Sequence, residues 1–197
     1  MTPPPDPRLL DRLLSVMEDE ILPRTRDGVA AGNKIFGAAI LRKADLSLVV
    51  ADTNRETENP LWHGEMQALK TFYELPAAGR PATADCLFLA THEPCSLCLS
   101  AITWTGFDNF TYFFSHEDSR DAFAIPHDLR ILKEVFRLEP GGYARENAFW
   151  KSHDLAALIA ESGDPALAAR AEALRGAYAD LSTAYQSGKS DNEIPLR

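Results

Sequence analysis

A continuous apolar run, Cys-Leu-Phe-Leu-Ala-Thr at residues 86–91, restricts the fold of this chain more than any other segment. A run without polar alternation is typical of a strand buried on both faces, in a sheet covered by helices on both sides. Apolar runs also predict strands at 35–41, 46–51 and 110–114. Apolar residues at helical spacing predict helices at 8–22 (ending at Pro23), from Trp62 to about 73, from about 95 to 105, and near 129–136.

The order strand–strand–helix–strand–helix–strand–helix predicts an α/β fold, a three-layer α/β/α sandwich around a mixed sheet. The first two strands are close enough in sequence to form an antiparallel hairpin. A helix separates the strands at 86–91 and 110–114, so these should pair in parallel through a right-handed crossover. We expect a core at residues 1–137. Residues 138–197 should form an appendage packed on it, a loop at 140–153 followed by Ala- and Leu-rich helices at 154–162 and 165–186.

Two short motifs flank these strands and supply the ligand types that zinc prefers. His63-Gly64-Glu65 stands at the start of a predicted helix, and Pro94-Cys95-Ser96-Leu97-Cys98 lies between a strand and a helix. One imidazole and two thiolates leave the fourth position of tetrahedral zinc open, as in catalytic sites. A helix N-terminus favours thiolates. H-x-E together with P-C-x-x-C is the signature of zinc nucleobase deaminases, whereas either motif alone also occurs by chance or in structural zinc sites.

With these motifs the chain resembles the cytidine deaminase-like superfamily over roughly residues 9–137. The resemblance implies a mixed, largely parallel five-stranded sheet. It is closest to the guanine deaminase and tRNA adenosine deaminase branch. The segments that carry it are Phe36-Gly37-Ala38, Asn54, His63–Met66, Glu93–Cys98 and Ala101–Trp104.

The resemblance implies one catalytic Zn²⁺ per subunit, held by His63, Cys95 and Cys98 with water as the fourth ligand. Glu65 would shuttle protons. It would take a proton from the zinc-bound water, which attacks the amino-bearing ring carbon as hydroxide, and deliver it first to a ring nitrogen and then to the departing ammonia.

Four residues are implied to bind the substrate. Phe36, Asn54 and the backbone N–H of Gly64 match positions beside the site in relatives, and Asp128 is a weaker candidate for reading an amino or ring N–H group. Each side chain also has a structural alternative to substrate binding. Phe36 would pack in the core, Asn54 would cap a turn, and Asp128 would be a helix N-cap. Gly64 replaces the Ala that is commonest in this branch, a small change that should leave the chemistry intact.

Charge favours a small substrate over RNA. The chain has 20 Lys and Arg against 29 Asp and Glu, a net charge of −9, whereas a tRNA enzyme must neutralise several phosphates. We therefore expect a hydrolytic deaminase of a free aminated heterocycle, guanine-like first, with cytosine, nucleosides or triazines behind. A tRNA adenosine deaminase is the first alternative. The second is a catalytically silent, zinc-stabilised partner subunit, against which Glu65 argues.

The sequence also bears on where the protein is located and how it assembles. No stretch approaches the roughly 18–20 apolar residues of a membrane span, and the N-terminal residues lack the features of a secretory signal. Three cysteines are too few for a disulfide scaffold. We expect a cytoplasmic protein, and the resemblance implies a homodimer.

Overall fold

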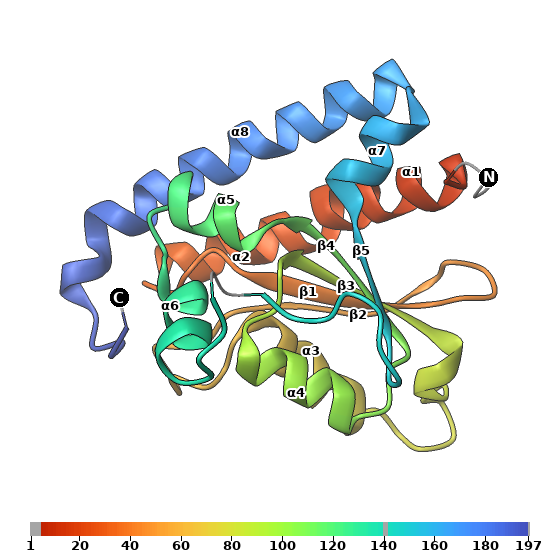
Figure 1. Ribbon diagram of the computed structural model, residues 1–197, viewed down its shortest axis with the longest axis horizontal. Coiled ribbons are helices and arrows are strands. Elements are labelled where there is room, and N and C mark those ends of the chain that lie inside the picture. The colour runs from red at the N-terminus through yellow and green to blue at the C-terminus, as the bar shows by residue number, and fades with distance from the viewer. Residues whose placement is uncertain (1–4, 140–141, 197) are drawn as a thin grey trace.

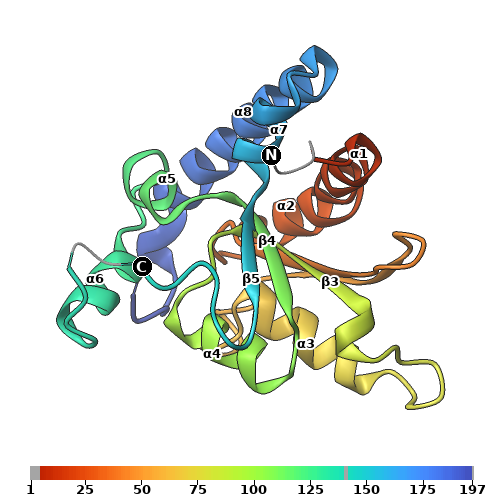
Figure 2. The same cartoon turned by 45° about the vertical axis from the view of Figure 1, so that its right-hand side comes forward.

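A five-stranded sheet forms the centre of the molecule. The computed structural model describes residues 5–139 and 142–196. Within them the strand order is β2-β1-β3-β4-β5, and Figures 1 and 2 show helices on both sides of the sheet. The strands are β1 (Gly37–Arg42), β2 (Leu48–Thr53), β3 (Cys86–His92), β4 (Asn109–Phe114) and β5 (Lys151–Asp154).

The pairing confirms the mixed sheet. β1 pairs antiparallel with both β2 and β3, so the predicted hairpin is present. β3 and β4 pair in parallel across an intervening helix, as expected, and β5 extends this parallel half. Because β3 is central, its continuous apolar run is accounted for: Phe88 and Leu89 belong to apolar clusters on opposite faces.

Two helical layers enclose the sheet (Figure 1). One face is covered by α3 (Gly64–Glu74) and α4 (Ser96–Trp104), which pack on Ala38, Ile40 and Phe88. A larger apolar cluster, including Ala39 and Leu89, lies beneath the helices of the other face. Those helices are α1 (Pro7–Val16), α2 (Leu22–Ala30), α7 (Leu155–Ser162) and α8 (Pro165–Gly188). This is the three-layer α/β/α sandwich that the sequence predicts.

The predicted end of the first helix at Pro23 is wrong. A π-helical turn at Met17–Ile21 joins α1 to α2, and Pro23 falls in the first turn of α2. Proline is tolerated there because the first N–H groups of a helix have no partner within it.

The predicted loop at 140–153, whose first two residues lie outside the described part of the chain, is also wrong in its last part, because Lys151–Asp154 forms β5. The helices α7 and α8 confirm those expected after it. The division at residue 137 stays a prediction, and residues beyond it contribute both a strand and apolar packing to the central body. Two short helices, α5 (His116–Asp121) and α6 (His127–Glu134), lie between β4 and β5. No helix that the structure describes is long and apolar enough to cross a bilayer.

Candidate active site

The two sequence motifs meet at the N-termini of α3 and α4. His63 is the N-cap residue of α3 and Cys95 is the N-cap residue of α4, and neither side chain forms the usual capping hydrogen bond to the first turn of its helix. Both are therefore free to face the space between the helices. Cys98 joins them from the first turn of α4. The positive end of the helix dipole favours thiolates there, whereas burial and the neighbouring Cys95 raise the pKa of Cys98 well above its usual value.

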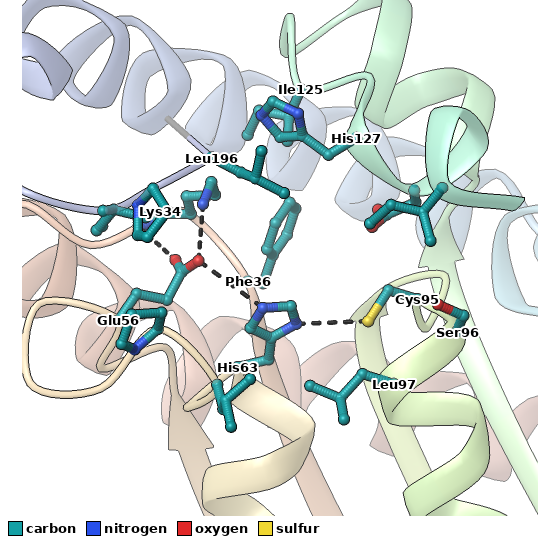
Figure 3. A pocket seen from close by; sticks show the side chains of 16 residues that line it. Lys34, Phe36, Glu56, His63, Cys95, Ser96, Leu97, Ile125, His127 and Leu196 are labelled. Carbon is teal, nitrogen blue, oxygen red and sulfur yellow. Dashed lines mark hydrogen bonds and ion pairs between the residues drawn. The ribbon is translucent and has the colours of Figure 1, made fainter. Parts of the chain in front are cut away.

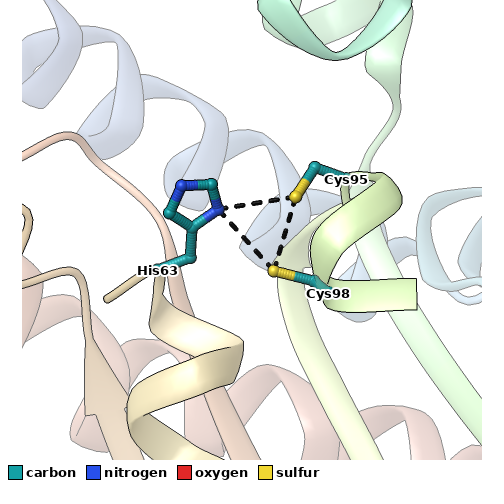
Figure 4. A group of neighbouring side chains, drawn as sticks. All are labelled: His63, Cys95 and Cys98. Carbon is teal, nitrogen blue, oxygen red and sulfur yellow. Dashed lines mark hydrogen bonds between the residues drawn. The ribbon is translucent and has the colours of Figure 1, made fainter. Parts of the chain in front are cut away.

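The three side chains form a compact donor set (Figure 4). The Sγ of Cys95 lies 3.5 Å from His63 Nδ1 and 3.5 Å from Cys98 Sγ, and Cys98 Sγ lies 3.7 Å from His63 Nδ1. Tetrahedral zinc with its usual bond lengths places sulfur atoms about 3.8 Å apart, and sulfur and nitrogen about 3.5 Å apart. The hydrogen bond with Cys98 holds the pKa of Cys95 well below its usual value. The donor set therefore fits zinc.

Glu65 lies against this donor set. Its side chain is buried, and its Oε2 accepts a hydrogen bond from Cys98 Sγ at 3.3 Å. Burial, with the negative charge of Cys95, raises the pKa of Glu65 to about 7. The structure thus brings together all four residues that the motifs single out.

A cavity of about 260 Å³ opens in front of His63 and Cys95 (Figure 3). Its walls are mostly apolar, and Ile194, Pro195 and Leu196 of the C-terminal segment form part of them. A smaller hollow continues inward to Glu65 and shares four lining residues with the first: Phe36, His63, Cys95 and Asp128.

Two predicted substrate contacts, Phe36 and Asp128, thus line both hollows. Asp128 is the second residue of α6, whose N-cap is Pro126, so the plainer interpretation of Asp128 as an N-cap is wrong. Burial raises the pKa of Asp128 to about 6.

Asn54 and Gly64 are placed differently. Asn54 is fully buried, its Oδ1 accepts the backbone N–H of Gly64 at 2.5 Å, and its Nδ2 donates to Glu56 Oε2 at 2.7 Å. The side chain therefore ties the turn before α3 to the segment after β2. Neither residue is among those that line the two hollows.

Gly64 lies against Gly37 at the start of β1. A Cβ atom on Gly64 would come within 2.5 Å of Gly37 Cα. An alanine at position 64, the residue commonest in this branch, would therefore meet a steric obstacle in this chain, because backbone and not a flexible side chain stands in the way.

We expect Gly64→Ala to destabilise the protein by about 1–3 kcal/mol, the usual effect of overpacking, and to lower its zinc content by moving His63 and Glu65. Denaturant unfolding and metal analysis measure both effects. Gly176→Ala is the matched control: its Cβ would meet no atom within 4 Å in the middle of α8, and Ala is the better helix former. A Gly64→Ala protein with wild-type stability and zinc content would contradict the steric argument.

Sequence reasoning missed a buried carboxylate beside the metal ligands. The side chain of Glu93 is 0% exposed, accepts the backbone N–H of His116 at 2.9 Å, and forms an ion pair with Arg145. Arg145 also donates to Tyr112 Oη at 2.6 Å and lies over the Tyr143 ring. Glu93 directly precedes Pro94-Cys95, a sequence signal for its place, but nothing in the sequence pointed to Arg145 as its partner.

Comparison with known proteins matches this part of the chain. The family described as the cytidine and deoxycytidylate deaminase zinc-binding region matches residues 15–114. Guanine deaminase from Bacillus subtilis (strain 168) is 30% identical over 99 residues, 49% of this chain and 61% of that protein, so the match spans less than two thirds of this relative.

Solved structures extend the likeness to the whole fold. A guanine deaminase from Nitrosomonas europaea is 19% identical with a TM-score of 0.54, covering 95% of this chain and 97% of its own. A mutant protein solved in complex with 8-azaguanine is 19% identical with a TM-score of 0.55, covering 95% and 96%. At this identity the two structures establish a shared fold.

Proposed function

The chain belongs to the cytidine and deoxycytidylate deaminase zinc-binding family, whose members are zinc-dependent hydrolases of C–N bonds, and on that premise we propose that it deaminates a small, guanine-like aminated heterocycle. One observation carries the proposal: Glu65, the donor set of His63, Cys95 and Cys98, and a cavity of about 260 Å³ adjoin one another. Pockets that bind drug-sized ligands measure roughly 300–1,000 Å³, so a cavity just below this range suits a compact ligand. The relative from Bacillus subtilis, a guanine deaminase, favours a purine.

Metal binding and proton transfer fall to different residues of the site. One zinc ion held by His63, Cys95 and Cys98 would supply an activated water for the amino-bearing carbon. Glu65 takes up one proton of the attacking water at its carboxylate and delivers it to a ring nitrogen. It then carries the second proton of that water to the departing amino group, which leaves as ammonia. Its position beside Cys98 supports this role, because a proton carrier must lie within reach of the reacting atoms.

Substrate recognition falls to the residues that line the cavity. The Phe36 ring offers a face to a planar base, and Asp128 accepts a hydrogen bond from an amino or ring N–H group. Asn54 and Gly64 are one step removed, because neither lines the two hollows. The one N–H of Gly64 is donated to Asn54, so a substrate contact through it requires that bond to be exchanged. Ile194, Pro195 and Leu196 exclude water from the chamber when a base is bound.

The apolar lining of the cavity argues for a free base over RNA. Single-stranded nucleic acid is held by positively charged grooves with stacking aromatic side chains. Here Pro60, Leu61 and the C-terminal residues 194–196 contribute apolar surface, and the lysine in the wall, Lys34, is neutralised by Glu56.

Ammonia release from a panel of compounds tests the proposal. The panel contains guanine, cytosine, adenine, their nucleosides and an amino-triazine, beside a tRNA anticodon stem-loop, with protein of measured zinc content. We expect guanine or a close analogue to be turned over. Turnover of the stem-loop alone would replace the proposal by RNA editing. Zinc-loaded protein without activity on any compound would favour the silent partner subunit.

The homodimer stays a proposal that rests on the resemblance. Large apolar side chains exposed on this single chain are compatible with it: Trp104 at the end of α4 is 90% exposed, and Phe149 is 67% exposed. Cytoplasmic location is likewise a prediction from the sequence.

A further inference from the structure

A buried ion pair lies in the wall of the cavity. The Nζ of Lys34, just before β1, is 2.7 Å from Oε1 of Glu56, which follows β2, and the two side chains are only 5% and 2% exposed. Removing two charges from water is costly unless each is paired and further hydrogen-bonded. Such a pair in a largely apolar wall therefore calls for an explanation beyond stability.

Glu56 is the shared acceptor of several groups around the first metal ligand. Its Oε2 accepts the side-chain amide of Asn54 at 2.7 Å, and Asn54 in turn holds the backbone N–H of Gly64. Its Oε1 lies 3.8 Å from Nε2 of His63. Glu56 thus reaches the turn before α3 by two routes, one through Asn54 and one directly to the imidazole.

The imidazole of His63 lies between the cysteine thiols on one side and the carboxylate of Glu56 on the other (Figure 3). Its Nδ1 faces the two thiols, and its Nε2 faces Glu56. When Nδ1 binds a metal, the neutral ring carries its proton on Nε2. Metal-binding histidines usually donate that second N–H to a carboxylate, a carbonyl oxygen or water, which fixes both tautomer and ring orientation.

We propose that Glu56 is a positioning residue whose carboxylate, 3.8 Å from Nε2 of His63, attracts the N–H on that nitrogen and so holds Nδ1 toward the metal. This inference rests on the proposed zinc site and deepens it. Glu56 lies outside both sequence motifs, and its role acts through His63 without contact to the reacting atoms.

Lys34 explains how a further carboxylate is accommodated here. The donor set already contains two cysteines, and Glu65 is adjacent to them. An unpaired Glu56 would add negative charge next to the two cysteines and Glu65, whereas the ion pair of Glu56 with Lys34 is neutral overall. The ion pair thereby places a carboxylate beside His63 without adding net charge to the surroundings of the donor set.

Zinc affinity tests the proposal directly. We expect Glu56→Gln to raise the zinc dissociation constant by about 10–100-fold, measured by competition with a chromophoric chelator. The visible absorption bands of the cobalt-substituted protein should shift as the imidazole loses its fixed orientation. Glu58→Gln is the matched control, because Glu58 lies two residues away with a side chain that is 55% exposed, and it should bind zinc like the wild type.

A double variant protects the test against misfolding. Glu56→Gln alone leaves the Lys34 ammonium buried and unpaired, whereas Lys34→Met with Glu56→Gln removes both charges at nearly constant size. The same loss of zinc affinity is expected in the double variant. Wild-type affinity and cobalt bands in either folded variant would overturn the positioning role, even if the metal-free protein melts at a lower temperature. A wild-type chain that takes up no zinc would overturn the proposed function and this inference together.

Discussion

Replacing Glu65 with glutamine should lower kcat by about 10²–10⁴-fold, the range that proton transfer by a positioned side chain contributes. Glutamine has the size of glutamate but does not take up and release a proton. The loss corresponds to about 3–5 kcal/mol in activation free energy. Because the Glu65 side chain is buried beside Cys98 and outside the donor set, zinc content and unfolding midpoint should stay near wild type.

Steady-state kinetics on whichever compound the wild type turns over gives the measurement. Glu74→Gln provides the comparison on the same helix, because its side chain is 60% exposed at the far end of α3. That variant should retain full activity. A Glu65→Gln enzyme with kcat within a few-fold of the wild type would remove the proton-shuttle role.

Removal of one thiolate should have an equally large effect on the metal. We expect Cys95→Ala to lose stoichiometric zinc, since two donors remain of the three that His63, Cys95 and Cys98 provide. Metal binding stabilises the folded state by an amount that grows with the logarithm of free metal over the dissociation constant, about 4 kcal/mol at a 1,000-fold excess. The variant should therefore melt at a lower temperature than the zinc-loaded wild type, and a chelator should lower only the wild-type value.

The third thiol of the chain supplies the control. Cys86 is buried at the beginning of β3, whereas the metal motif follows the end of that strand, about 20 Å away at the usual rise per residue. Cys86→Ala should lose some stability and keep its zinc. Stoichiometric zinc in Cys95→Ala would mean that the donor set is different from the one proposed.

The strands and helices with strong apolar patterns could be predicted from the sequence, and the weakly patterned ones could not. β5 consists of Lys-Ser-His-Asp, which has no strand signature. It forms because the edge of β4 is available for parallel pairing. Pro23 normally marks a helix end, but a π-helical turn places it where a new helix begins.

The residues of the site likewise fall into those that the sequence could predict and those that it could not. His63, Glu65, Cys95 and Cys98 belong to short motifs with fixed spacing, so their meeting was predictable, and the structure brings them together. Glu56 and Arg145 act through partners brought near only by the tertiary fold. A lone charged residue in a sequence is usually solvated, and no spacing rule distinguishes one that is buried.

The ion pair of Arg145 with Glu93 bears on how proteins of this kind can be recombined. The family match ends at residue 114, yet Arg145 lies beyond it and compensates a carboxylate two residues before Cys95. A fragment cut at the end of the match would leave Glu93 buried without its cation and expose the β4 edge to intermolecular pairing. A chimera that exchanges C-terminal segments between relatives must therefore transfer the arginine and its carboxylate together.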